Sequence, residues 1–484
     1  MQPKYININI NIRENNLYLE KDENPAMVSI DTGEDDSIPN NIRIELGITK
    51  VFHKVLNLIK SEPDLFQKED FELLGEMLAK ILFGKKNDTK NFRNYIMKDV
   101  EFLLDQKNQG GNKICRIYLE FDYDSKVAML PWEYTRYQTR ATDVNAPQSW
   151  YIAANNKSRF NLIRRVKRNP TPQPDAEMMF VIVIANMEGN NAADPSIDVR
   201  IKEFPKIKSL FQNLQQLNSN EPENFPYPLE VAYLENISSG DIGKEIERIY
   251  HQWETTYQVQ PNYIIHYTGH AMMRNQVGQI VVKNKEDKME WREDKKFAAI
   301  FNKEKLTVPQ PSLVCLQACD SAKIGSIGGE LRGVAYEFTR LDIPAVVGMQ
   351  NEINTSSSCA FFEKFYASLL KGDDVASAIT NGRDHLGINF NIDDETYINN
   401  SFGSPVLFIT TREPIQLLKS TAAEILNNQT GNMADANRQK TRLSESVRDI
   451  NKNEKSLLQE NANQQNTDTQ ADQLLKDDLS NRNK

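Results

Sequence analysis

The sequence is poor in cysteine and lacks any long hydrophobic run. Four cysteines among 484 residues are too few for the disulfide framework of a small secreted domain, so we expect reduced thiols. No apolar run approaches the length of a membrane span, and the N-terminal MQPKYINININIREN alternates isoleucine with asparagine in place of a signal-peptide core. These absences favour a soluble, cytoplasmic protein.

Basic charge is also in short supply. The chain has 58 Lys and Arg against 67 Asp and Glu, which gives a net charge of -9. A nucleic-acid-binding protein is expected to present a basic face. We therefore predict no direct contact with nucleic acid and, because no membrane segment is evident, none with a membrane.

The length of the chain exceeds what one hydrophobic core usually supports, which predicts more than one domain. Residues 1–168 combine an alternating strand at 5–13, helical patterns at 44–60 and 69–83, and a strand at 114–121, as expected for an N-terminal α+β accessory module. Three prolines within residues 169–174 predict a linker.

Residues 175–412 alternate short apolar strands with amphipathic helices, the pattern of an α/β domain with a mostly parallel sheet flanked by helices. Six strands are expected, at 178–185, 229–234, 263–265, 313–316, 344–348 and 405–409. A C-terminal helix should follow at 413–430. The last segment, 431–484, is too polar to bury a core and is predicted to be disordered or a solvated helix.

Two of these strands end in residues suited to catalysis. Cys319 follows the apolar run LVCLQ, and His270 follows the run YIIHYT and a glycine. The carboxyl edge of a parallel sheet is where ligands bind in open α/β folds. A thiol has a pKa of about 8.5, so a neighbouring imidazole would make it a better nucleophile.

These motifs have three other interpretations, of which the first is a metal site and the second a phosphate-binding loop. Both His266/His270 and Cys315/Cys319 have the spacing of metal ligands on a helix, but on a strand each pair would be about 13 Å apart, so we expect no metal. Glycines 325, 328, 329 and 333 lack the sequence of a phosphate-binding loop and predict a mobile loop beside the cysteine.

The third interpretation makes Cys319 a buried packing residue. The polar residues that follow it, DSAK, argue instead for a solvated loop. Cys315, inside the apolar run, is the better structural cysteine, and we also assign structural roles to Cys115, Cys359 and the strand residue His266.

The motifs resemble those of the CHAT family, caspase-like proteases of the same clan as separase. The segments that carry the resemblance are YIIHYTGHA (263–271), LQACDS (316–321), LPWEY (130–134) with LIRRV (162–166), GVAYEFTRLDIPAVVGMQ (333–350) and GSPVLF (403–408). They occur in order over about residues 40 to 410. The chain departs from the family in having Ala271 where glycine often follows the histidine, and from metacaspases in having Gln317 in place of Asp.

The resemblance implies a caspase-like sandwich and a cysteine endopeptidase without a cofactor, acting through His270 and Cys319. The backbone N–H groups of Ala271 and Cys319 would form the oxyanion hole. We expect low basal activity until a protein partner or signal orders the active-site loops, and a role in bacterial defence, such as antiviral defence, or in cell death. A catalytically silent scaffold of the same fold is the alternative, and a nucleotide-binding α/β protein is less favoured.

The resemblance to separase also favours a protein substrate cut after Arg or Lys. Three carboxylates in the loops that follow the Cys319 strand and the next strand could bind such a side chain: Asp320, Glu330 and Glu352. Asp320, beside the nucleophile, is the first candidate.

Overall fold

The computed structural model describes residues 4–13, 16–19, 28–29, 44–45, 68–83, 113–121, 126–138, 149–154, 160–166, 168, 170, 176–186, 203–286, 288–328, 330–388, 400–412 and 414–418. The tail predicted at 431–484 lies outside these residues, as does most of the helix predicted at 44–60. Its first two residues form strand β4 (Ile44–Glu45) instead of helix. Of the predicted C-terminal helix, only residues 414–418 are described, and they are not helical.

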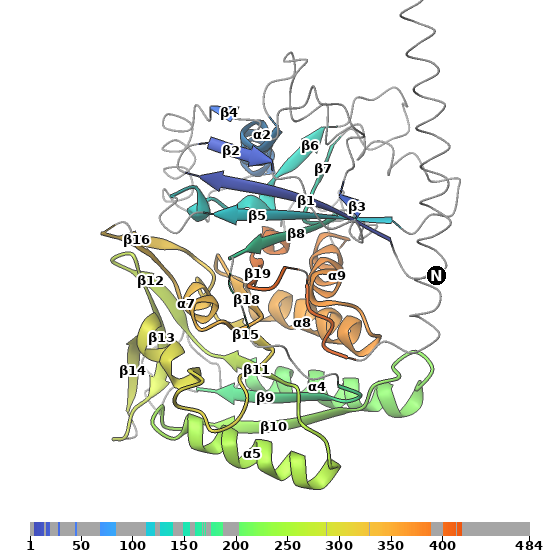
Figure 1. The fold of residues 1–484 in the computed structure, drawn as a ribbon, viewed down its shortest axis with the longest axis vertical. Helices are drawn as coiled ribbons and strands as arrows, with labels where there is room; N and C mark the ends of the chain where they lie inside the picture. Colours follow the sequence, from blue (N-terminus) through green and yellow to red (C-terminus); the bar gives the residue numbers. More distant parts are fainter. Residues whose placement is uncertain are drawn as a thin grey trace, which may run out of the picture. The chain divides into compact units, whose positions relative to one another are not determined.

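The six strands predicted for residues 175–412 form one contiguous block (Figure 1). Their order is β10 (Leu229–Glu235), β9 (Met179–Ala185), β11 (Tyr263–Thr268), β15 (Leu313–Gln317), β18 (Ala345–Met349) and β19 (Pro405–Ile409). All neighbours pair in parallel except β18 and β19. Strands such as β9, MFVIVIA, are apolar throughout because both faces of the sheet are covered. The predicted mostly parallel α/β fold is confirmed.

The sheet continues beyond β19 into the N-terminal part of the chain. Strand β8 (Phe160–Arg165) pairs with β19, followed by β5 (Lys113–Phe121), β1 (Lys4–Arg13), β2 (Asn16–Leu19) and β4, while β3 (Val28–Ser29) pairs with β1. Within the described residues the sheet therefore has twelve strands rather than six. Residues before and after the predicted linker share this sheet, and their division into two domains stays a prediction.

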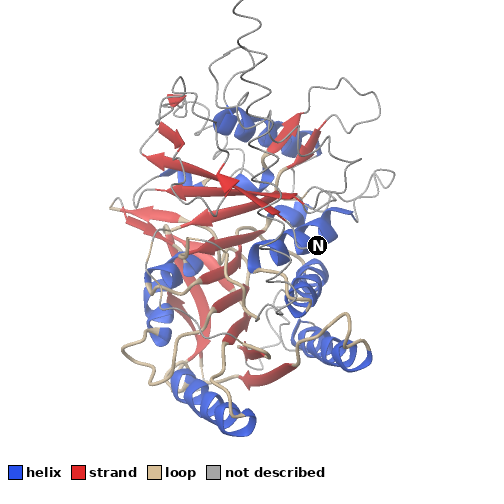
Figure 2. Cartoon of the chain, turned by 45° about the vertical axis from the view of Figure 1, so that its right-hand side comes forward, coloured by secondary structure: helices blue, strands red, loops and turns tan. Residues whose placement is uncertain are grey.

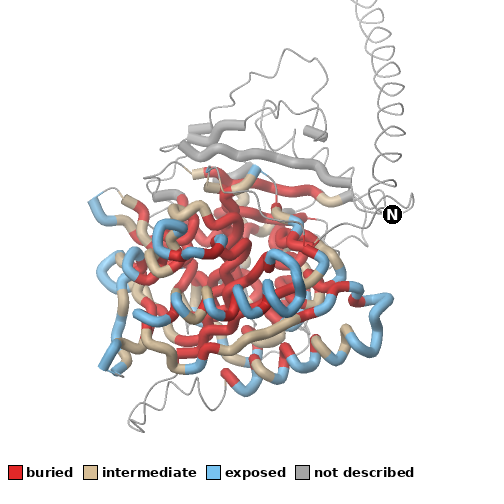
Figure 3. Tube along the Cα trace, turned by 60° about the horizontal axis from the view of Figure 1, so that its bottom comes forward, coloured by how far each residue is buried: buried red, intermediate tan, exposed pale blue. Residues whose placement is uncertain are grey.

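Helices cover both faces of the block, as Figures 1 and 2 show. One face carries α4 (Phe204–Asn220), α8 (Thr355–Leu370) and α9 (Val375–Ile388), which share one core with Val181 and Val183 of β9. The other carries α5 (Ile242–Tyr257), α6 (Asp294–Ala298) and α7 (Val334–Arg340), in a second core with Ile182 and Ile184. The central strands are buried and the outer helix surfaces are exposed (Figure 3).

Shorter elements surround the end of the sheet where β11 and β15 finish. A three-stranded sheet contains β12 (Ala271–Arg274), β13 (Val277–Lys283) and β14 (Met289–Glu293). The predicted glycine-rich loop instead forms a hairpin of β16 (Gly325–Ile327) and β17 (Glu330–Arg332). Its Gly325 lies so close to the backbone of Gln276 that a side chain would not fit.

The remaining described elements are α2 (Lys68–Phe83), β6 (Arg136–Gln138), β7 (Ser149–Tyr151), and the 3₁₀ turns η3 (Lys126–Met129), η4 (Trp132–Tyr134), η6 (Ala299–Phe301) and η7 (Asn400–Gly403). The helix predicted at 69–83 is therefore confirmed as α2. Among the described residues, no helix combines the length and apolar character needed to cross a membrane.

Candidate active site

Strand register brings the two predicted catalytic residues to the same edge of the sheet. Thr268, the last residue of β11, lies opposite Gln317, the last residue of β15, in a parallel pair. His270 and Cys319 each follow by two residues, and both are half-buried. Adjacent strands are about 4.8 Å apart, so the chain leaves the sheet at neighbouring points after Thr268 and after Gln317.

Gly269 lets the backbone pass close to Tyr267 just before His270. A side chain at this position would overlap the phenol of Tyr267, whose hydroxyl donates to the carbonyl of Val281 at 2.6 Å. The N–H of Gly269 donates to the carbonyl of Gln317 at 3.3 Å, so the strand pairing extends one residue toward the site. Glycine is required here by close packing rather than by a left-handed backbone.

The backbone of Ala271 is oriented by the pairing of β12 with β13. The N–H of Val281 donates to the carbonyl of His270 at 2.9 Å, and Ala271 lies opposite Ile280. Hydrogen-bonded and non-bonded pairs alternate along an antiparallel ladder, so Ala271 occupies a non-bonded position. Its N–H therefore points away from β13.

The loop after Cys319 is held by the buried side chain of Ser321. Its hydroxyl donates to the carbonyl of Leu316 at 3.2 Å and accepts from the N–H of Met349 at 2.9 Å. The N–H of Ala322 donates to the carbonyl of Met349 at 2.8 Å. The serine of the LQACDS motif thus ties the nucleophile loop to the end of β18.

The surroundings of Cys319 favour the neutral thiol. Burial raises the pKa of Cys319 above its usual value, and the carboxylates of Glu352, Glu203 and Asp320 raise it further. A hydrogen bond with the backbone of Ile353 acts in the opposite direction and lowers this pKa. At neutral pH the resting site therefore holds mainly the thiol.

Glu203 is a carboxylate close enough to Cys319 to raise its pKa, and the sequence analysis missed it. It immediately precedes α4, and its carboxylate accepts from the hydroxyls of Thr355 at 3.1 Å and Thr268 at 3.5 Å. Burial raises the pKa of Glu203, while these two hydroxyls lower it. The available signal was Pro205, which marks the start of a helix and so places Glu203 at the sheet edge.

The three predicted substrate-binding carboxylates have different surroundings. Asp320 has a left-handed backbone, with φ of 56°, and both of its carboxylate oxygens lie 3.3 Å from the ammonium group of Lys323. Glu352 is exposed in the loop after β18, and its charge raises the pKa of Cys319. Glu330 forms ion pairs with Lys295 and Arg340. It is not among the groups that shift the pKa of Cys319.

Other polar residues of the two motifs have structural roles. His266 is fully buried between the hydroxyl of Tyr366 at 3.0 Å and the side-chain oxygen of Gln317 at 3.1 Å. Burial lowers the pKa of His266 to about 3, so the ring is neutral at ordinary pH. Cys315 is fully buried, and Cys359 lies 3.8 Å from the amide nitrogen of Gln317. Among the described residues, no three His, Cys, Asp or Glu side chains are grouped to hold a metal ion.

Sequence comparison matches the CHAT domain model to residues 100–387, more than half of the chain. No curated protein matches.

Solved structures with a similar fold have low identity and low TM-scores. The separase–securin complex of Saccharomyces cerevisiae matches with 14% identity and a TM-score of 0.34, over 78% of this chain and 21% of that chain. The Drosophila initiator caspase Dronc matches with 9% identity and a TM-score of 0.31, over 49% and 82%. Raptor of Chaetomium thermophilum matches with 12% identity and a TM-score of 0.23, over 42% and 19%. The match thus spans about a fifth of the separase chain.

Proposed function

Because the chain belongs to the CHAT-domain family, we propose that it is a cysteine endopeptidase with Cys319 as nucleophile and His270 as general acid and base. One observation carries the proposal: the register of β11 and β15 delivers both residues to the same edge of the sheet. A nucleophile and a base at adjacent strand ends are the minimum that thiol-dependent acyl transfer needs.

In the proposed reaction, the proton of the Cys319 thiol passes to His270 and the sulfur attacks the scissile carbonyl. The C–N bond breaks as His270 returns that proton to the leaving amine, and a thioester remains. Water, deprotonated by His270, then hydrolyses the thioester and regenerates the thiol. The N–H groups of Ala271 and Cys319 would bind the oxyanion, at about 3 kcal/mol per donor. The orientation of Ala271 away from β13 supports its part in this role.

We propose a protein substrate cut after Arg or Lys. Glu203, Asp320 and Glu352 all act electrostatically on Cys319, so negative charge gathers where the side chain before the cut would lie. Glu203 is the strongest candidate among them, because it is partly buried and its nearest partners are neutral hydroxyls. Asp320 is less favoured because it is paired with Lys323, and Glu330 because it has two cationic partners.

The raised pKa of Cys319 supports the proposal that activity is low until a protein partner or the substrate changes the site. The same observation would fit a silent scaffold, which is the alternative. A place in bacterial defence or cell death is proposed on family resemblance alone, as is an accessory role for residues 1–168.

The test is a peptide probe with Arg before an acyloxymethyl ketone, which alkylates an active thiol. Mass spectrometry should find the label on Cys319, and Cys319→Ala should remove it. Cys359→Ala is the matched control and should leave labelling intact, because this thiol is not at a strand end. Cleavage or labelling that survives Cys319→Ala would contradict the proposal. Labelling of Cys319 by iodoacetamide but never by the peptide probe would favour the scaffold.

A further inference from the structure

Residues 350–354, here called the 350–354 loop, join β18 to α8 beside the candidate nucleophile. The loop carries Glu352, whose charge raises the pKa of Cys319, and Ile353, whose backbone lowers it. It begins directly after Met349, whose backbone bonds Ser321 and Ala322 of the segment that follows Cys319. At its far end Asn354 caps α8 by accepting from the N–H of Ser357 at 2.7 Å. The position of the 350–354 loop therefore affects the pKa of Cys319.

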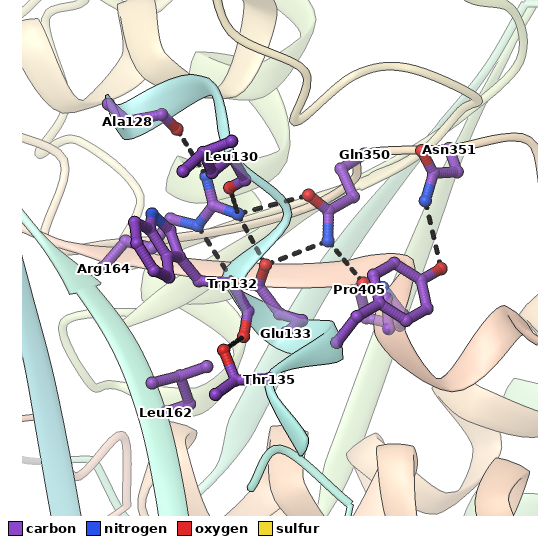
Figure 4. Close-up of polar contacts among 12 residues, drawn as sticks. Ala128, Leu130, Trp132, Glu133, Thr135, Leu162, Arg164, Gln350, Asn351 and Pro405 are labelled. Atoms are coloured by element: carbon purple, nitrogen blue, oxygen red, sulfur yellow. Dashed lines mark hydrogen bonds and ion pairs between the residues drawn. The ribbon is translucent and has the colours of Figure 1, made fainter. Parts of the chain in front are cut away.

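The near end of the loop is fixed by Gln350, which is only 6% exposed. Its amide nitrogen donates to Oε2 of Glu133 at 2.9 Å and to the carbonyl of Gly403 at 2.6 Å. Its amide oxygen accepts from Nη2 of Arg164 at 3.2 Å. Figure 4 shows Gln350 facing Arg164 and Glu133. Both ends of the amide are thus held by residues from the N-terminal part of the chain.

Glu133 is itself held rigidly. Its carboxylate forms a bidentate pair with Arg164, at 3.0 Å to Nε and 2.5 Å to Nη2, and neither residue is more than 2% exposed. The guanidinium also donates to the carbonyls of Ala128 at 2.9 Å and Leu130 at 3.1 Å (Figure 4). A buried bidentate pair with further hydrogen bonds has one well-defined geometry.

Asn351, the next residue of the loop, also hydrogen-bonds a residue of η4. The side-chain amide nitrogen of Asn351 donates to the hydroxyl of Tyr134 at 3.0 Å, and the backbone carbonyl of Asn351 accepts from the hydroxyl of Ser404 at 3.1 Å. Two consecutive residues of the loop therefore contact two consecutive residues of η4, Glu133 and Tyr134. These contacts join positions 217 residues apart in sequence.

A buried ion pair contributes less to stability than well-packed apolar residues of the same volume would, so stability alone is a weak reason for it. We propose that Glu133 and Tyr134 are positioning residues that hold the 350–354 loop against Cys319 through Gln350 and Asn351. The proposal rests on the proposed role of Cys319 as nucleophile. It gives the LPWEY segment a task in the active site, although none of its residues is among the groups that act on Cys319.

The experiment measures alkylation of Cys319 in the full chain by iodoacetamide across pH 6 to 10, with the labelled peptide quantified by mass spectrometry. Two variants loosen the loop: Tyr134→Phe removes one hydroxyl, and Gln350→Met keeps the size of the side chain without its hydrogen bonds. Thr380→Val is the matched control, because its buried hydroxyl bonds Asn161 at 2.8 Å between α9 and β8, away from the loop. Glu203 and Asp320 are unchanged throughout.

Loosening the loop weakens two opposed effects on the pKa of Cys319, the lowering by the Ile353 backbone and the smaller raising by Glu352. The alkylation profiles of Tyr134→Phe and Gln350→Met should therefore shift to higher pH. At neutral pH the rate should fall about fivefold or more, as expected for losing one hydrogen bond to a charged group. Thr380→Val should keep the wild-type profile. In a double-mutant cycle, Asn351→Ala should add little to Tyr134→Phe, because both remove the same bond.

Wild-type profiles in folded Tyr134→Phe and Gln350→Met would overturn the proposal, and so would an equal shift in Thr380→Val, which would indicate a general loss of stability. Alkylation does not require proteolysis. A positioning effect on a thiol that never cleaves peptide would therefore count against the proposed function and leave the positioning role standing.

Discussion

His266 of β11 and Gln317 of β15 share a hydrogen bond of 3.1 Å inside the sheet. The two strands that deliver His270 and Cys319 are thus joined by buried side chains as well as by their backbones. The ring of His266 also contacts the hydroxyl of Tyr366 on α8, so strand spacing and helix position are fixed together.

This buried imidazole predicts a pH-dependent stability. The pKa of His266 is about 3 in the folded protein, below about 6.5 in an unfolded chain, so the unfolded state takes up the proton first. The contribution of neutral His266 to the free energy of unfolding is fully present above pH 6.5 and is lost as pH falls toward 3. Between pH 6 and 4, the protonation of His266 should lower the free energy of unfolding by about 1.4 kcal/mol per pH unit, and His266→Gln should remove this dependence.

Urea unfolding at several pH values would measure that slope. Glu337, whose pKa is raised to about 7 mainly by burial, contributes in the opposite sense but is present in both proteins, so the difference between them isolates His266. Parallel stability profiles for wild type and His266→Gln would contradict the neutral, buried state.

The catalytic assignment predicts two inactive but folded variants. Cys319→Ala should abolish peptide cleavage, and His270→Ala should reduce it by about 10²- to 10⁴-fold, the usual contribution of a general acid–base group. Thermal unfolding should change little, because both side chains are half-buried and fill no large core volume. His251→Ala, on the exposed surface of α5, should keep full activity. Full cleavage by either site variant would exclude the pair.

Glu203 should determine the proposed preference for a basic residue before the cut. Glu203→Gln removes the charge and keeps hydrogen bonding to Thr268 and Thr355, so kcat/KM for an Arg substrate should fall about 10- to 100-fold, with little loss for a norleucine substrate. Glu330→Gln is the control and should leave the preference unchanged, because Lys295 and Arg340 already pair that carboxylate. A positional peptide library read by mass spectrometry would compare them, and a preference for Asp would end the idea.

The pair formed by Glu133 and Arg164 should be costly to break. Glu133→Gln would leave the guanidinium of Arg164, and that of Arg383 at 3.9 Å, buried without this counter-ion. We expect a loss of about 3 to 5 kcal/mol in the free energy of unfolding. Glu245→Gln, which removes the exposed pair with Arg248, should cost less than about 1 kcal/mol. Equal losses in denaturant titrations would show that the buried pair has no special role.

The sequence predicted the strands and the order of the main elements because apolar runs such as those of β9 and β15 depend only on burial. It could not predict that β8 pairs with β19, since strand neighbours distant in sequence leave no local periodicity. The hairpin of β16 and β17 was mistaken for a loop because glycines conceal strand pairing.

In the candidate site, too, the sequence indicated residues next to strands but not contacts between distant segments. His270 and Cys319 stood out in the sequence because each follows a recognisable strand, and their catalytic roles stay predictions. Glu203 was not, because its approach to Thr268 and Thr355 depends on how α4, β11 and α8 meet. The importance of Glu133 was also hidden, since nothing in LPWEY indicates that its partner is Gln350.

The carboxylates around Cys319 predict that a basic ligand activates the thiol. After burial, Glu352, Glu203 and Asp320 are what raise the pKa of Cys319. A guanidinium among them would offset their charge, so the pKa of Cys319 should fall and more thiolate should be present at pH 7. N-acetyl-arginine amide should therefore shift the alkylation profile of Cys319 to lower pH, whereas N-acetyl-norleucine amide should not.

Shielding of the thiol by the bound ligand is distinguishable, because it would lower the maximal rate at high pH without moving the midpoint. The shift should disappear in Glu203→Gln and persist in Glu330→Gln, whose carboxylate does not act on Cys319. A midpoint that arginine amide leaves unchanged would mean that these carboxylates do not bind the substrate's cation. The raised pKa of Cys319 would then have to be lowered by a protein partner instead.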